Sequence, residues 1–227
     1  MYEPPRSAFG ASPKGAQAAD RQSRIRACRL IAAGIRGDQR TSMSAPASSL
    51  RLRPTMLSDL DFVITVEQDP ANLPFITPWD RTQHEGAIRF PDFRHFIVEA
   101  GSGYPSAGFV ILQGCRNPHR SIELKRIVLQ AELHGRGHGR VAIRLLAQMA
   151  FRDLGAHRFW LDVKSANERA LALYRSEGFV EEGRLRESVR SGAGFDSLIV
   201  MSMLRPEYDA LVEARANAAS DVAHAPR

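Results

Sequence analysis

The sequence predicts an α/β fold, with a mixed central sheet of about seven strands and helices on both faces. Three observations lead to this prediction. Runs with an apolar or alternating strand pattern recur between Leu50 and Leu204. Two amphipathic helical patterns, Gly139–Leu154 and Asn167–Glu177, lie between the later strands. A glycine-rich loop joins a strand to the first of these helices, so the strands on either side of that helix should be parallel neighbours.

The first half of the predicted domain consists of strands and short helices, several of which end near prolines. Ser58 is the candidate N-cap of the first helix. The expected elements are a strand at Leu50–Arg53, helices at Asp59–Gln68 and Thr82–Arg89, and a meander of strands at Arg94–Ala100, Ala107–Gln113 and Ser121–Gln130.

The second half alternates helices and strands. The helix Gly139–Leu154 should end at Gly155, because glycine readily adopts the left-handed conformation found after a helix C-terminus. Asn167 should cap the next helix. The remaining strands are expected at Arg158–Val163 and in a hairpin formed by Val180–Arg190 and Phe195–Leu204.

The domain boundaries follow from composition. Residues 49–206 form the predicted domain, between a basic, disordered tail at 1–48 and a C-terminal tail at 207–227. Translation could also begin at Met43, within the first tail. The first 48 residues hold eight basic residues against three acidic ones, so +5 of the net charge of +6 belongs to this tail. The charge therefore gives no support to nucleic-acid binding by the domain.

Cysteine content and hydropathy bear on the compartment. The two cysteines, Cys28 and Cys115, make no disulfide framework, which favours a reducing environment. The sequence has no apolar run near the roughly 18 residues of a membrane span. We therefore expect a cytoplasmic protein without a membrane partner.

The glycine-rich loop Gly135–Gly139 predicts a phosphate site. Glycines let backbone N–H groups approach an anion, and the unpaired N–H groups and dipole of the following helix favour negative charge. The N–H groups from Arg136 to Arg140 could bind phosphate, and the two arginines could add charge-assisted hydrogen bonds. A glycine-rich surface turn is the alternative interpretation.

Three motifs occur in order along the chain. The first is Glu123-Leu124 followed by Ile127-Val128-Leu129, and the second is His134-Gly135-Arg136-Gly137-His138-Gly139. The third combines Asn167 with Ala170-Leu171, Leu173-Tyr174 and Gly178-Phe179. Together they resemble the GCN5-related N-acetyltransferase (GNAT) family, except that histidine stands at position 134 where the family has Gln or Arg. The resemblance covers Leu50 to Leu204. Its closing patterns, Glu182–Arg186 and Met201–Leu204, look most like the branch with ribosomal-protein N-terminal and polyamine acetyltransferases.

The resemblance implies the acyl-CoA N-acyltransferase-like fold, with acetyl-CoA as the acetyl donor and no metal. The pantetheine arm would pair with the backbone of a strand that splays away from its neighbour. The residues assigned to CoA are Ile127, Val128, Leu129, His134, Gly135, Arg136, Gly137, His138, Gly139, Arg140 and Asn167. Core packing is a compatible role for the three strand residues, and helix capping alone explains Asn167.

The resemblance also implies two catalytic residues. The acceptor amine must be neutral to attack a thioester, and near pH 7.4 only about one lysine-like amine in a thousand is neutral. Glu123 lies where relatives place a base that acts through water, and Tyr174 lies where a hydroxyl protonates the departing thiolate. The structural alternatives are a Glu123 carboxylate paired with Lys125 and a Tyr174 ring packed on the sheet.

Several points are left open by the sequence. His134 and His138 stand four residues apart, but the glycines between them argue against the helix that a metal-binding pair needs. Relatives form the acceptor pocket in the segment around Trp79, and the acceptor is either a protein N-terminus or a small amine such as a polyamine. A CoA-binding sensor or interaction module without catalysis is the alternative function. The sequence does not indicate an oligomeric state.

Overall fold

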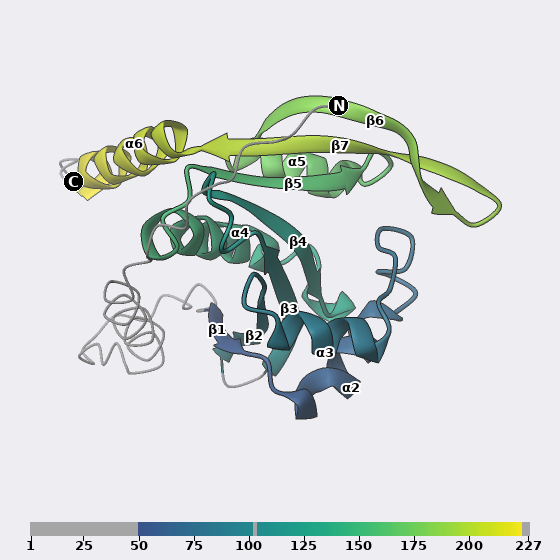
Figure 1. Cartoon of the computed structure of the whole chain (residues 1–227). Helices are drawn as coiled ribbons and strands as arrows, with labels where there is room; N and C mark the ends of the chain where they lie inside the picture. Colours follow the sequence, from purple (N-terminus) through teal and green to yellow (C-terminus); the bar gives the residue numbers. More distant parts are fainter. Residues whose placement is uncertain (1–49, 102–103, 224–227) are drawn as a thin grey trace, which may run out of the picture. The chain divides into compact units, whose positions relative to one another are not determined.

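The computed structural model describes residues 50–101 and 104–223, which belong to one compact unit, Ala45–Arg227. The expected tail at 1–48 lies outside the described residues. A seven-stranded mixed sheet in the order β1-β2-β3-β4-β5-β7-β6 forms the centre of the unit (Figure 1). The predicted fold class is therefore confirmed. Within the described residues, no helix is both long and apolar enough to cross a membrane.

The first four strands form an antiparallel meander. They are β1 (Leu50–Pro54), β2 (Arg94–Ala100), β3 (Tyr104–Gln113) and β4 (Ser121–Leu129). All four lie where the sequence pattern predicts them, because alternating apolar residues are buried on the two faces of the sheet. The meander forms one half of the sheet and carries β4, the strand of the first motif.

Two helices, α2 (Leu60–Glu67) and α3 (Arg81–Arg89), cover one face of this meander. The predicted Ser58 cap is wrong. Ser58 lies in a 3-10 turn, η1 (Leu57–Asp59), and the Asp59 carboxylate accepts a hydrogen bond from the Met56 N–H at 2.8 Å. Arg53 also donates to this carboxylate, and no side chain of the described residues caps the start of α2.

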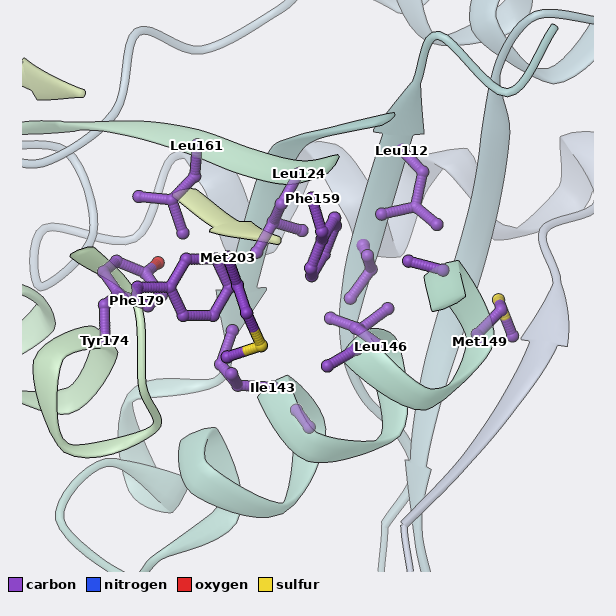
Figure 2. Packing of buried hydrophobic residues seen from close by; sticks show 14 of the residues in the cluster. Leu112, Leu124, Ile143, Leu146, Met149, Phe159, Leu161, Tyr174, Phe179 and Met203 are labelled. Atoms are coloured by element: carbon purple, nitrogen blue, oxygen red, sulfur yellow. The ribbon is translucent and has the colours of Figure 1, made fainter. Parts of the chain in front are cut away.

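The opposite face is covered by α4 (His138–Gln148), which continues into a π-helical turn, η4 (Met149–Asp153). Apolar side chains of α4 pack on the sheet around Phe159 and Leu161, as Figure 2 shows. Gly155, at φ +68°, ends the helix as predicted. The chain then enters β5 (Arg158–Lys164), which pairs with β4 in parallel, also as predicted.

The C-terminal part adds α5 (Glu168–Ser176) and a hairpin of β6 (Val180–Ser191) and β7 (Gly194–Leu204), with β7 placed between β5 and β6. The segment assigned to a C-terminal tail differs from the expectation. It forms most of α6 (Arg205–Ala223), whose Tyr208 ring stacks on Phe151 with centroids 4.7 Å apart. This helix is rich in alanine, a strong helix former, so it needs only a short apolar contact at its start.

Candidate functional site

A cavity of about 1000 Å³ lies where β4 and β5 separate. The two strands pair only through Ser121–Glu123 and Arg158–Trp160. Beyond these residues, Leu124–Leu129 of β4 and Leu161–Lys164 of β5 line the cavity instead of pairing with each other. A buried strand edge must find hydrogen-bond partners, so this gap presents unpaired backbone groups to whatever the cavity binds.

A β-bulge in β4 coincides with the start of the gap. Ile111 of β3 pairs with Arg126, but the next residue, Leu112, pairs with Leu124, so Lys125 is an extra residue in β4. A bulge bends its strand and increases the local twist. The bulge therefore gives a physical reason why β4 leaves β5 immediately after Glu123.

The backbone direction along the exposed part of β4 can be assigned from its hydrogen bonds. The Gln130 N–H donates to Ala107 of β3 at 2.9 Å, so residue 130 faces the meander. Successive strand residues alternate, and the peptide groups of Leu129 and Ile127 therefore face the gap. The Leu129 carbonyl accepts hydrogen bonds there from His134 Nε2 at 3.1 Å and Asn72 Nδ2 at 3.2 Å.

His134 thus binds the strand that precedes its loop. Because a carbonyl only accepts, Nε2 carries the ring proton, and Nδ1 is free to accept from Arg169 Nη2 at 3.4 Å. The histidine, which stands where Gln or Arg was expected, is held between β4 and α5 at the cavity wall.

The glycine loop Gly135–Gly139 leads directly into α4. Gly135 and Gly137 have φ values of +74° and +81°, a left-handed conformation that residues with a side chain rarely adopt. Glycine is therefore needed for the backbone conformation and not for space, because a Cβ on either residue would meet no atom within 4 Å. The first N–H groups of α4 have no partner within the helix. Gly135, Gly137 and Gly139 line the cavity, so open space lies beside these donors, as a bound anion requires.

The charged residues of the loop have different environments. Arg136 is exposed and lies outside the cavity wall, whereas Arg140 lines the cavity. His138 is buried away from the cavity, and its Nδ1 has no hydrogen-bond partner among the described residues. His134 and His138 therefore do not converge on one point, which argues against a metal pair at this loop.

Arg140 also belongs to a cluster of partly exposed arginines around one buried carboxylate, which the sequence pattern did not predict. Its Nη1 donates to Glu177 Oε1 at 2.6 Å, and the same carboxylate accepts from Arg144 at 2.7 Å and Arg215 at 2.6 Å. Burial would raise the pKa of Glu177, but the hydrogen bonds from Arg144 and Arg215 hold it below its ordinary value. Glu177 follows α5 directly before Gly178, so only its place beside a helix-ending glycine marked it in the sequence.

Glu123 and Tyr174 differ in their relation to the cavity, because only Tyr174 is part of its wall. Glu123 is buried beside the gap, where Lys125 Nζ donates to its Oε1 at 3.0 Å. Among the described residues that line the cavity, Lys125 is included and Glu123 is not. Burial raises the pKa of Glu123, Lys125 opposes this shift, and the nearby Asp162 carboxylate adds to it. The pKa of Glu123 therefore lies above its usual range.

Tyr174 lines the cavity from α5, with its ring packed against Phe179 at a centroid distance of 5.7 Å (Figure 2). Burial, and to a lesser degree the charge of Asp162, raises the pKa of the Tyr174 phenol. The hydroxyl therefore stays protonated at neutral pH. Asn167 lines the same cavity and caps α5, its Oδ1 accepting from the Ala170 N–H at 3.1 Å.

The other end of the cavity is formed by the loop between α2 and α3, which includes Phe75–Trp79. Buried Glu67 holds this loop, because its Oε2 accepts from the Trp79 N–H at 2.8 Å and its Oε1 accepts from Arg126. Arg126 also donates to the Thr77 carbonyl at 2.9 Å and lies over the Trp79 ring at 4.8 Å. Glu67 shares the helical spacing of Leu60 and Val63, which indicates a place on the buried face of the helix, but its contacts with the loop depend on the folded chain.

A second cation closes the same end of the cavity. Lys164, the last residue of β5, donates to the Pro74 carbonyl at 3.0 Å and pairs with Asp196 of β7 at 3.1 Å. It therefore joins three segments that are distant in sequence. The α2–α3 loop is thus fixed to both walls of the gap, to β4 by Arg126 and to β5 by Lys164.

Comparison with known proteins gives a consistent result. The profile of the acetyltransferase (GNAT) family matches residues 60–179. Spermidine N(1)-acetyltransferase of Escherichia coli (strain K12) is 26% identical over 172 residues, 71% of this chain and 89% of that protein. A putative ribosomal N-acetyltransferase of Bacillus subtilis (strain 168) is 27% identical over 114 residues, 49% of this chain and 62% of that protein.

The solved structures agree. The crystal structure of spermidine N-acetyltransferase from Vibrio cholerae in complex with CoA and spermine aligns with a TM-score of 0.64 and 27% identity, over 70% of this chain and 97% of that chain. The family match covers more than half of the chain and spans both walls of the cavity. The chain therefore belongs to the GNAT acetyltransferase family and is an acetyl-CoA-dependent N-acetyltransferase that acts on a primary amine.

Proposed function

We propose that this chain transfers acetyl from acetyl-CoA to a primary amine of a small polyamine, within the cavity between β4 and β5. The observation that carries the proposal is the continuity of one cavity from the glycine loop, past the open edge of β4 and Tyr174, to the loop Phe75–Trp79. A donor and an acceptor can therefore meet without either leaving the protein. The polyamine is the first choice because spermidine acetyltransferases match the chain over about 70% of its length.

Acetyl-CoA would occupy the part of the cavity between α4 and α5. The backbone N–H groups from Arg136 to Arg140 would bind its phosphates, and Arg140 would add a cation. The pantetheine arm would pair with the backbone of Ile127 and Leu129, replacing the missing contacts to β5. His134 and Asn72 would keep the Leu129 carbonyl in place, since a carbonyl oxygen can accept more than one hydrogen bond.

The chemistry would proceed in one ternary complex. The neutral amine nitrogen attacks the thioester carbonyl, and the C–S bond breaks as the amide forms. Tyr174 donates its phenolic proton to the departing thiolate, and the amine's surplus proton passes through water to the Glu123 carboxylate. Burial supports both roles, because it keeps the phenol protonated and makes the carboxylate a better proton acceptor than an exposed one.

The test is acetyl-CoA-dependent thiol release with a panel of amines: spermidine, a lysine analogue, and peptides with a free Ser or Ala N-terminus. We expect release with spermidine. Release with the peptides alone would replace the polyamine by a protein N-terminus as the acceptor. Tight acetyl-CoA binding without release by any amine would contradict the proposal.

A further inference from the structure

Asp162 is a carboxylate of the cavity wall that no role described so far uses. It is a half-buried residue of β5 and lines the cavity together with Tyr174 and the open part of β4. Its side chain has no hydrogen-bond or ion-pair partner within residues 50–101 and 104–223. A carboxylate that is partly removed from water without a counter-charge is costly, so this position favours a cation from outside the chain.

Asp162 carries a negative charge in the cavity wall that no basic side chain of the described residues neutralises by direct contact. The basic side chains that β4 and β5 contribute to the cavity wall already have acidic partners: Lys125 pairs with Glu123, Arg126 with Glu67, and Lys164 with Asp196. Because their charges are compensated within the protein, they leave Asp162 uncompensated.

The sheet register brings Asp162 close to the reacting groups. Glu123 of β4 pairs with Trp160, and Asp162 lies two residues further on, on the same face of the sheet. At this point the two strands have parted, and Asp162 lines the cavity that opens between them. Its charge adds to the raised pKa of both Glu123 and Tyr174, so it acts on both proposed proton-transfer groups.

We propose that the Asp162 carboxylate binds the ammonium group of the acceptor and thereby holds the acceptor nitrogen beside the thioester. This inference rests on the proposed function. It specifies the group of the acceptor that is recognised, an aliphatic primary ammonium bound by one carboxylate. Before attack, the ammonium releases one proton to solvent, so the Glu123 carboxylate is still ionised when it takes the surplus proton that the nitrogen loses on attack. Asp162 then retains the neutral amine through a remaining N–H, and the lone pair is free to attack.

The experiment uses the full chain with Asp162→Asn, which preserves the shape of the side chain and removes its charge. Asp153→Asn is the matched control, because Asp153 is an exposed aspartate outside the cavity wall with no hydrogen-bond or ion-pair partner among the described residues. Binding of spermidine and of the Ser and Ala peptides to the protein–CoA complex is measured by calorimetry. Turnover is measured separately with every amine that supports it.

We expect Asp162→Asn to weaken amine binding and raise the amine KM about 10- to 100-fold, the effect of losing a charge-assisted hydrogen bond. Acetyl-CoA affinity should stay unchanged, Asp162→Glu should restore part of the loss, and Asp153→Asn should behave as the wild type. Unchanged amine binding in Asp162→Asn, or no amine binding by the wild type, would overturn the inference. A lower kcat at constant amine KM would also overturn it.

These readouts separate the two proposals. If the wild type binds an amine, loses it in Asp162→Asn, but never releases thiol, the proposed function fails and the Asp162 site stands. If thiol is released and Asp162→Asn is indistinguishable from the wild type, the function stands and the Asp162 site fails.

Discussion

The environment of Tyr174 keeps its phenol protonated, which supports the proposed role of this residue as an acid. Burial and the Asp162 charge both raise its pKa, while its ring is held by Phe179. A protonated phenol can donate to a thiolate, and it regains its proton afterwards because its pKa lies well above neutral. The packing of the ring and the chemistry of the hydroxyl are therefore compatible roles of one side chain.

Tyr174→Phe should lower kcat about 10²-fold or more, because it removes a general acid and leaves the ring in place. The acetyl-CoA KM and the thermal midpoint should change little, since the apolar contact with Phe179 survives. Steady-state kinetics and thermal unfolding measure the two quantities. A variant with normal kcat would show that the thiolate is protonated from elsewhere.

If Glu123 is the base, its raised pKa should appear in the pH dependence of kcat/KM. Its pKa is raised, so the ionised base is present above that pKa and is lost as the pH falls through it. The acceptor amine titrates at a much higher value, about 10.4 for a lysine-like amine. Logarithmic kcat/KM should therefore rise with a slope of one near neutral pH and steepen to two below the Glu123 pKa.

Glu123→Gln should lower kcat/KM at neutral pH and keep a slope of one throughout the acid range, because only the amine still titrates. The pH–rate profiles of the two proteins, measured with one amine, give this comparison directly. Two superimposable profiles would assign the base to another group.

Among the elements, α4, α5 and α6 are joined by one carboxylate. Glu177, which is 1% exposed, accepts from Arg140 and Arg144 of α4 and from Arg215 of α6. Because Arg140 also lines the cavity, the C-terminal helix is connected to the glycine-loop end of the cavity through two ion pairs. The Ala-rich α6 is thus part of the framework of the site.

Glu177→Gln should lower the free energy of unfolding by about 1–3 kcal/mol, because a buried carboxylate with charged partners is lost. Since the pKa of Glu177 is lowered, its stabilising effect is present above the unfolded value of 4.5 and is lost as the pH falls below it. Denaturant unfolding of wild type and variant at neutral and acid pH measures this difference.

The control is Glu182→Gln. Glu182 pairs with Arg158 and is 40% exposed, so its loss should cost under about 1 kcal/mol. Equal effects of the two substitutions would contradict the structural role given to Glu177.

The elements were largely predictable, and the exceptions have physical causes. Strand alternation and the glycines at 155 and 178 mark local conformation, so they appear in the sequence pattern. The contact that holds α6 does not appear in the sequence pattern, because it depends on Phe151 lying opposite Tyr208 in the folded chain. The motifs indicated Glu123 and Tyr174 as the candidate proton-transfer residues. Asp162 was not indicated, because its place in the cavity wall depends on the separation of β4 from β5.

For the whole molecule, the sheet consists of two halves with a narrow junction. The meander β1–β4 and the group β5-β7-β6 are joined by only three residue pairs, with the cavity beyond them. A ligand in the gap would pair with both halves. Binding of CoA should therefore stiffen the sheet across its middle.

Hydrogen exchange tests this expectation. The amides of Ile127 and Leu129 should exchange fast in the free protein and become protected when CoA is added, because the ligand supplies their missing partners. Amides between β2 and β3 should not change and serve as the internal control. Equal protection of both regions without CoA would contradict the open edge.

The bulge at Lys125 links the presence of the cavity to the number of residues in β4. Without that residue, the pairing of Ile111 with Arg126 and of Leu112 with Leu124 would be an uninterrupted ladder. A deletion of one codon would then let β4 run straight beside β5, with the side chains of both strands still on their present faces. We therefore expect deletion of Lys125 to extend the pairing of β4 with β5 and to narrow the cavity, while the hydrophobic core keeps its present side chains.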